Sequence, residues 1–173
     1  MYKSIISLFL FLVFGFLNQA QTSIKTNSAN SISADSLVTF AKKQLGIKYR
    51  YANANPKAGF DCSGFVYYVF AHFNIKLPRA SMDYEKTGKI IHPDSCKAGD
   101  IIVFTGTHIK NRKPGHVGII ISNSSGEINF IHSSSGHKRI GVIITNFNTS
   151  PYYKSRFIKI VRLSYSFGQL RLS

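Results

Sequence analysis

One stretch, residues 59–66 (GFDCSGFV), constrains the fold of this chain more than any other. Asp61 is a good helix N-cap residue, and the apolar residues after it have the spacing of one core-facing helical face: Phe65, Val66, Val69, Phe70 and Phe73. Cys62 then lies in the first turn, where unpaired N–H groups and the positive end of the helix dipole favour a thiolate. This environment lowers the pKa of a cysteine and predicts a nucleophile. A buried structural thiol is the alternative, but Gly64 argues against a helix start that only packs, because Gly costs about 1 kcal/mol relative to Ala.

The first twenty residues have the pattern of a secretory signal peptide. Lys3 supplies the charge, residues 5–17 the apolar region, and Ala20 a small residue before the cut. Because a bilayer span needs roughly twenty apolar residues, this stretch predicts export and no stable membrane span. Residues 21–34 are rich in Ser, Asn and Thr and are expected to form a flexible lead-in. The remaining chain is expected to form one domain over 35–165, with a tail at 166–173.

The strong basic charge favours a polyanionic partner. The formal net charge is +15, and removal of Lys3 with the signal leaves +14. For an exported chain the candidates are cell-envelope polymers such as wall polymers and lipopolysaccharide, or an anionic membrane surface. Nucleic acid is not expected, since no basic helix is interleaved with aromatic residues. A generally solvated basic surface is the alternative.

The two cysteines raise the question of a disulfide. A Cys62–Cys96 bridge is conceivable in an exported chain, but it would silence Cys62 as a nucleophile. We interpret Cys96 as an incidental loop thiol. The sequence has no CxxC and no HExxH motif, so neither a metal nor a cofactor is predicted.

The order of helical and strand patterns indicates an α+β fold. A first helix is expected over 36–45, capped by Asp35 or Ser36 and ended by Gly46, and a short helix over 81–87 follows the Cys62 helix. The later part of the chain contains short β-branched or aromatic runs bounded by turn residues: 100–105, 116–122, 127–132, 141–145 and 157–163. Helices followed by such runs predict N-terminal helices packed on an antiparallel sheet of about five strands.

Two histidines occupy strand positions that suit a base for Cys62. His116 opens one expected strand, and His132 closes the next strand after the turn at 123–126. Antiparallel pairing brings the start of one strand beside the end of its partner, so the two rings are expected to lie side by side. A cysteine nucleophile needs a base and a group that orients the base. We therefore predict that His116 is the base and His132 the orienting group.

These residues carry a resemblance to a known family. Tyr49 is followed by DCSGF at 61–65, AGDIIVF at 98–104, GHVGIII at 115–121 and FIHSSS at 130–135. In this order, over about residues 36–163, the chain resembles the NlpC-type cell-wall cysteine peptidases. The resemblance implies a papain-like α+β core and hydrolysis of peptide bonds in peptidoglycan stem peptides, commonly after D-isoglutamate. It assigns Cys62 as nucleophile, His116 as base and His132 as orienting group.

The resemblance also implies roles around the nucleophile. The hydroxyl of Tyr49 is expected by the active site, where it would help to stabilise the oxyanion, and the backbone N–H of Cys62 or Ser63 is the other donor. Asp61 and Ser63 are grouped with the residues that face substrate. Arg79 is expected to form either a bidentate pair with a stem-peptide carboxylate or a structural ion pair.

One position departs from the family pattern, and other functions stay open. Ala52 and Asn53 stand where the family often has two glycines, and Asn53 is expected to adopt a positive φ. The alternatives are a wall amidase or acyltransferase that uses the same Cys and His residues, or an exported binding module without catalysis. Intact Cys62, His116 and His132 argue against the binding module, and the order of Cys before His favours the peptidase. A monomer is expected.

Overall fold

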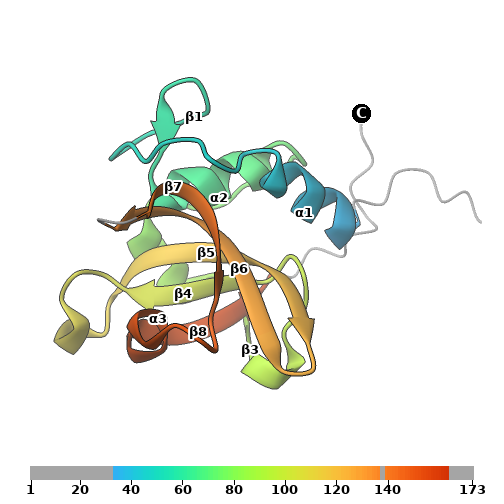
Figure 1. The fold of residues 1–173 in the computed structure, drawn as a ribbon, viewed down its shortest axis with the longest axis vertical. Coiled ribbons are helices and arrows are strands. Elements are labelled where there is room, and N and C mark those ends of the chain that lie inside the picture. Colours follow the sequence, from blue (N-terminus) through green and yellow to red (C-terminus); the bar gives the residue numbers. More distant parts are fainter. Residues whose placement is uncertain (1–32, 137–138, 164–173) are drawn as a thin grey trace, which may run out of the picture.

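The computed structural model describes residues 33–136 and 139–163 (Figure 1). Its helices are α1 (Ala34–Lys42), α2 (Cys62–Ala71) and α3 (Pro151–Arg156), with short 3-10 helices η1 (Ser81–Lys86), η2 (Pro93–Ser95) and η3 (Ile109–Asn111). The strands are β1 (Ala54–Asn55), β2 (Gly59–Phe60), β3 (Lys89–Ile91), β4 (Ile101–Thr105), β5 (Pro114–Ser124), β6 (Glu127–Gly136), β7 (Arg139–Asn146) and β8 (Phe157–Arg162). The expected signal peptide at 1–20, most of the expected lead-in and the tail at 166–173 lie outside the described residues.

The strands form one large antiparallel sheet in the order β3-β8-β4-β5-β6-β7, and β1 and β2 form a separate hairpin. The α+β class and the antiparallel sheet are confirmed. The sheet has six strands where about five were expected, because β3 adds a short strand at the edge. β3 pairs only three residues with β8, and so short a run carries no alternation of apolar and polar residues.

Helix α1 begins and ends earlier than expected. Its N-cap is Ser33, whose hydroxyl accepts a hydrogen bond from the N–H of Ser36, so the expected cap at Asp35 or Ser36 is wrong. The helix ends at Lys42, and a turn leads to Gly46, which has a φ of +82°. Gly46 therefore ends the turn rather than the helix. The expected lead-in likewise does not extend to residue 34.

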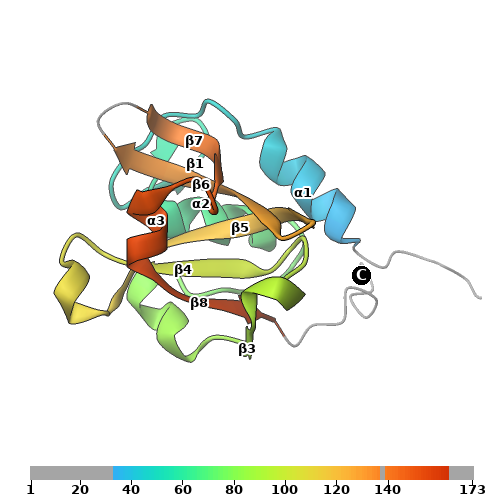
Figure 2. The ribbon, with the colours of Figure 1, turned by 60° about the horizontal axis from the view of Figure 1, so that its bottom comes forward.

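Helix α2 is capped as the sequence predicts, and it packs with α1 on one face of the sheet (Figures 1 and 2). The side chains of Phe65, Val66, Val69 and Phe70 are fully buried there, against sheet residues such as Ile101, Val117, Ile119, Ile131 and Val161. On the other face a second cluster gathers Phe104, Ile120, Phe130 and Ile160, with Tyr153 of α3 packed against it. The site described below lies at the start of β5, the strand that contributes to both clusters.

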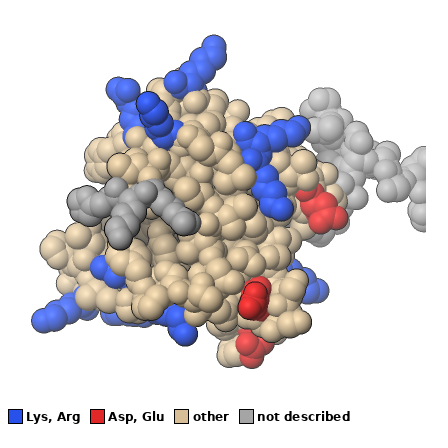
Figure 3. Space-filling view, viewed as in Figure 1, with Lys and Arg blue, Asp and Glu red and all other residues tan. Residues whose placement is uncertain are grey.

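On the face seen in Figure 3, basic side chains are spread rather than gathered in one patch. Lys and Arg lie at the top, at the upper right and along the lower margin, and the acidic residues lie at the right and the lower right. Within the described ranges, no helix is long and apolar enough to cross a membrane.

Candidate active site

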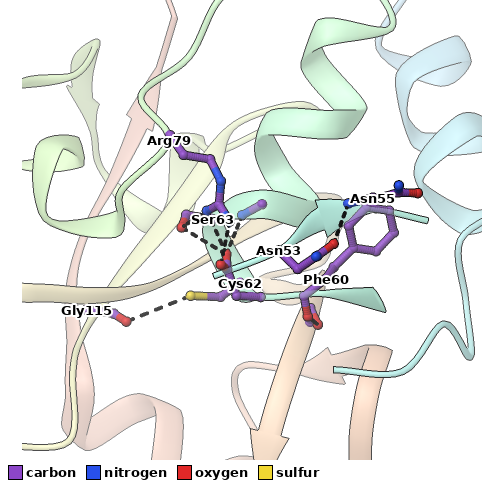
Figure 4. A network of polar contacts seen from close by, with 10 residues as sticks. Asn53, Asn55, Phe60, Cys62, Ser63, Arg79 and Gly115 are labelled. Atoms are coloured by element: carbon purple, nitrogen blue, oxygen red, sulfur yellow. Dashed lines mark hydrogen bonds and ion pairs between the residues drawn. The ribbon is translucent and has the colours of Figure 1, made fainter. Parts of the chain in front are cut away.

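Cys62 is the first residue of α2 and lies beside the start of β5. Its sulfur is 3.9 Å from the carbonyl oxygen of Gly115, the residue directly before His116, and the thiol points toward it (Figure 4). Only 8% of Cys62 is exposed. The start of β5 packs closely on the end of β4, because a Cβ on Gly115 would lie 2.3 Å from the Cα of Gly106. Helix α2 packs on β5, and this contact brings the strand that bears His116 against the helix start.

A dense polar network holds the N-terminus of α2. The Asp61 carboxylate caps the helix by accepting from the N–H of Gly64 at 2.6 Å. It also accepts two hydrogen bonds from the Arg79 guanidinium, at 2.9 and 2.6 Å, while Ser63 donates to it at 3.2 Å. The guanidinium of Arg79 approaches this cluster from beyond Ser63 in Figure 4. Of the two roles expected for Arg79, the structural ion pair is the one observed, since its bidentate partner is Asp61.

The expectation that the helix start lowers the pKa of Cys62 is wrong. Burial of the thiol raises its pKa, and the nearby negative charge of Asp61 raises it further. The backbone N–H groups of Val117, Ser63 and Cys62 lie near the sulfur and lower the pKa, but they do not outweigh these two effects. The resting group is therefore a neutral thiol, which needs a base to remove its proton.

The two predicted histidines lie side by side. Nε2 of His116 is 2.9 Å from Nδ1 of His132, as the strand pairing predicts. The register pairs Ile119 with Ile131, which places His132 opposite Gly118 and on the same face as His116. A Cβ on Gly118 would lie 3.1 Å from the Cβ of His132, so glycine leaves the room that the second ring occupies.

Thr145 extends this row by one residue that sequence reasoning missed. Nε2 of His132 is 3.0 Å from Oγ1 of Thr145 on β7. Thr145 on β7 pairs with Phe130 on the neighbouring β6. Its side chain therefore reaches His132, two residues further along β6, on the diagonal. No local motif surrounds Thr145, and only the β6–β7 register, fixed by the whole sheet, would have indicated it.

Aromatic rings enclose the histidine pair. Phe130 stacks on His132 with ring centroids 4.7 Å apart, and Tyr153 of α3 stacks on His116 at 5.7 Å. Burial lowers the pKa of His116 to about 4 and holds the pKa of His132 well below its ordinary value, with the neighbouring His116 adding to this effect. Both imidazoles are thus neutral near pH 7. Tyr153 is a second residue of the site without a recognisable sequence signal, because α3 has only 6 residues and was not expected.

This row of groups suits general-base chemistry. Because Nε2 of His116 is engaged with His132, Nδ1 is the nitrogen available to accept a proton from a thiol. His132 can accept at Nδ1 from His116 only if its own proton is on Nε2, and that proton is then donated to Thr145. In that tautomer, Oγ1 of Thr145 accepts from Nε2 of His132, and Nδ1 of His132 can accept from a protonated His116.

Tyr49 lies close enough to Cys62 for a thiolate there to raise its pKa, although burial is the larger cause. Its backbone forms a parallel bridge with Phe60, and its hydroxyl lies next to the side chain of Ser135. Tyr49 is therefore brought to the site as expected. Its contribution to oxyanion binding stays a prediction.

The loop that departs from the family pattern packs on the helix start. Ala52, with a φ of +54°, takes the left-handed conformation that was expected of Asn53, so that expectation is wrong. The carbonyl oxygen of Asn53 accepts from the N–H of Asp61 at 2.9 Å and would be 2.2 Å from a Cβ on Gly64. Gly64 is therefore needed for this close approach. A glycine at this position thus has a packing role, and the inference that it argues against a purely structural helix start is wrong.

The second cysteine and possible metal ligands lie apart from this site. Cys96 is a free thiol, as is Cys62; it lies in the loop after η2, as expected, and is buried in the cluster on the opposite sheet face. In the part of the chain that the structure describes, no three His, Cys, Asp or Glu residues are placed to hold a metal ion.

The sequence also matches a model of a known protein family. The NlpC/P60 family model matches residues 46–162, which is more than half of the chain. The chain belongs to the NlpC/P60 family. The resemblance inferred from the motifs is thereby confirmed.

Named relatives and solved structures of the NlpC/P60 family agree. A "Gamma-DL-glutamyl hydrolase" from Bacillus subtilis is 34% identical over 149 residues, which cover 86% of this chain and 34% of the relative. "Murein DD-endopeptidase MepS/Murein LD-carboxypeptidase" from Escherichia coli is 34% identical over 65% of this chain and 53% of the relative. The crystal structure of an NlpC/P60 family protein from Bacillus cereus superposes with a TM-score of 0.65 and 28% identity, over 75% of this chain and 40% of that one. The chain thus spans about a third to a half of the length of these relatives.

Proposed function

We propose that this NlpC/P60 domain is a cysteine peptidase that hydrolyses amide bonds in peptidoglycan stem peptides, at the bond between D-isoglutamate and a diamino acid. The observation that carries the proposal is the position of Cys62 at the start of α2, beside the start of β5, whose His116 is paired with His132 of β6. The names of the relatives, a glutamyl hydrolase and murein endopeptidases, supply the substrate class.

The neutral resting groups define the first chemical step. Nδ1 of His116 takes the proton of the Cys62 thiol as the sulfur attacks the carbonyl carbon of the scissile amide. The imidazolium that forms is stabilised because its Nε2–H donates to His132. The His116 proton then passes to the leaving nitrogen as the C–N bond breaks, which leaves a thioester on Cys62 and releases a free amine. His116 next deprotonates a water that hydrolyses the thioester and restores the thiol.

The N–H groups of Cys62 and Ser63 are the donors proposed for the oxyanion of the tetrahedral intermediate. Both belong to the first turn of α2, whose N–H groups have no acceptor within the helix, and both lie near the sulfur. Tyr49 is the proposed third contributor, on the basis of its position beside Cys62. The Asp61–Arg79 pair, in contrast, fixes the direction of the helix start.

The test is digestion of purified wall by the protein, followed by mass spectrometry of the products. Cleavage at the D-isoglutamyl bond yields fragments that end in isoglutamate and others that begin with a free diamino acid. Release of intact stem peptides would instead identify an amidase of the N-acetylmuramoyl–L-alanine bond. Wall that is unchanged by the wild-type protein and by Cys62→Ala alike would contradict the proposed function.

Export and an anionic envelope partner belong to the same proposal. The expected signal peptide and the substrate of the relatives both support a location outside the bacterial cytoplasm. The scattered basic residues support nonspecific attraction to wall polymers rather than one binding patch (Figure 3). Binding to insoluble wall, followed by pelleting, is therefore expected to weaken steeply with rising salt, since exposed charges are screened beyond about 8 Å at physiological ionic strength. Binding that is insensitive to salt would argue for recognition inside the cleft.

A further inference from the structure

A pocket of 820 Å³ lies against His116 on the side formed by α3. Its walls come from the end of β4, the start of β5, the ends of β6 and β7, and α3, and both His116 and Thr145 line it. Cys62 is not among its lining residues. Figure 1 shows α3 next to β4 and β8, on the opposite side of β4 and β5 from α2. The base therefore lines the pocket directly, whereas Cys62 lies at its border, 3.9 Å from the carbonyl oxygen of the lining residue Gly115.

Two buried polar atoms in this pocket have no hydrogen-bond partner within the described ranges. They are Oγ1 of Thr105, a residue that is 1% exposed, and Nε of Arg156. A buried donor or acceptor without a partner is costly, and such atoms are rare in folded proteins. Both residues line the pocket, so its walls carry polar groups that the fold itself does not satisfy.

Arg156 supplies the charge of this pocket. Its guanidinium carbon lies 3.8 Å above the Tyr152 ring, and Nη1 donates to the Tyr152 carbonyl oxygen at 3.4 Å. Two other guanidinium groups, those of Arg79 and Arg162, form ion pairs with Asp61 and Asp100, but in the described part of the chain no carboxylate lies within ion-pair distance of Arg156. Stacking on Tyr152 holds the guanidinium in place and leaves it free to bind an anion.

The wall that carries Arg156 is held in position. Arg112, from the β4–β5 loop, donates to the carbonyl oxygens of Ser155 and Phe157 at the end of α3. The loop that contributes Thr107 to the pocket is thereby tied to the helix that contributes Arg156. A preorganised cationic wall binds a ligand at a lower entropic cost.

The direction of the reaction tells which part of the substrate reaches this pocket. His116 delivers its proton to the leaving nitrogen, so the residue that bears that nitrogen lies next to His116, whereas the acyl part lies at Cys62. We propose that this pocket is the subsite for the leaving residue, and that Arg156 binds a free carboxylate of that residue. The inference rests on the proposed function and specifies the leaving group as a carboxylate-bearing diamino acid.

The kinetic test uses two soluble substrates, L-Ala-γ-D-Glu-diaminopimelate and the same peptide with both diaminopimelate carboxylates converted to carboxamides. The wild-type protein is expected to prefer the carboxylate form through a lower KM. Arg156→Gln is expected to raise KM for the carboxylate form roughly ten- to hundred-fold, the equivalent of one lost charged hydrogen bond, with kcat little changed. It is expected to leave the carboxamide form unaffected. Lys154→Gln, an exposed charge change on the same helix, is the matched control.

A binding measurement keeps the inference separate from the proposed function. Diaminopimelate and its dicarboxamide are titrated into the full-length Cys62→Ala protein and into Cys62→Ala with Arg156→Gln, by calorimetry. Weaker binding of the carboxylate ligand in the second variant supports the subsite even if no peptide is hydrolysed. Equal binding by both variants overturns the subsite, and so does an unchanged carboxylate preference in Arg156→Gln. Loss of hydrolysis with intact binding would contradict the proposed function alone.

Discussion

On the helix side of the active site the polar groups are charged and paired, whereas on the sheet side they are neutral and enclosed by rings. Asp61 and Arg79 form a bidentate ion pair at the start of α2, and the Arg79 side chain is 40% exposed. His116 and His132 bond to each other under Phe130 and Tyr153. The difference shows two ways of fixing a catalytic group: the ion pair sets the direction of a helix, and the enclosure sets a protonation state.

The largest losses of activity are expected for Cys62 and His116, the two residues between which the thiol proton is transferred. Cys62→Ala is expected to abolish hydrolysis, and His116→Ala to reduce kcat by about a hundred- to ten-thousand-fold, because no other group takes the thiol proton. Both variants should keep the wild-type circular dichroism spectrum.

Cys96 provides the matched control for the nucleophile. It is also buried and free, and burial raises its pKa to about 11, but no histidine contacts it within the described residues. Cys96→Ala is expected to keep near-normal turnover, and iodoacetamide should modify Cys62 faster than Cys96. Near-normal activity of His116→Ala would show that the base has been misassigned.

A smaller loss of activity is expected for His132 and Thr145, because these residues act on the reaction only through His116. His132→Ala should cost more activity than His132→Asn, since asparagine keeps a hydrogen-bonding group. Thr145→Val removes the partner of His132 Nε2 and is expected to lower kcat about five-fold, the equivalent of one net hydrogen bond of about 1 kcal/mol.

The control for Thr145 is Thr149→Val, which changes an exposed threonine four residues later. A positioning role for Thr145 predicts that its effect disappears in the His132→Ala background, since there is then no ring to orient. Additive losses in the double variant would contradict that role and indicate a general packing defect.

The enclosure of the histidines also predicts how stability depends on pH. The folded-state pKa of His116 is about 4, below the ordinary value of about 6.5 that applies to the unfolded chain. Between these values the unfolded chain binds a proton that the folded protein does not, so the free energy of unfolding falls as pH is lowered through this window. The contribution of the neutral His116 to stability is therefore lost as the pH falls through this window. Urea unfolding at several pH values measures it.

His116→Gln is expected to reduce this pH dependence, and His132, whose pKa burial also lowers, is expected to account for part of what remains. An equally steep dependence in His116→Gln and in the wild type would show that His116 is not the group that resists protonation.

The sequence predicted those parts of the site that are encoded locally. Cys62 follows its own N-cap, and His116 and His132 lie on two strands joined by one short turn, so spacing alone placed them together, although β6 continues past His132 to Gly136 and does not end there as expected. Thr145 and Arg156 were missed because they reach the site only through the β6–β7 register and the packing of α3 on the sheet. The pKa of Cys62 was predicted with the wrong sign, because the helix start was visible in the sequence and the burial that outweighs it was not. The partner of Arg79 was left open for the same reason: the contact spans 18 residues.

The smallest effect is expected on the helix side, in the loop that packs on α2. Ala52 has a φ of +54°, a conformation that costs a residue with a Cβ about 1 to 2 kcal/mol and costs glycine almost nothing. Ala52→Gly is therefore expected to raise the free energy of unfolding by about 0.5 to 1 kcal/mol, after the greater entropy of glycine in the unfolded chain is subtracted. Ala58→Gly is the matched control, because Ala58 is exposed in the β1–β2 turn and is not in the left-handed region, so the same change there should destabilise. Activity should be unaffected in both variants, since the Asp61–Arg79 pair holds the helix start independently of this strain. If Ala52→Gly is instead destabilising, or lowers activity, the methyl group of Ala52 contributes to the site, and the helix side depends on more than its charged pair.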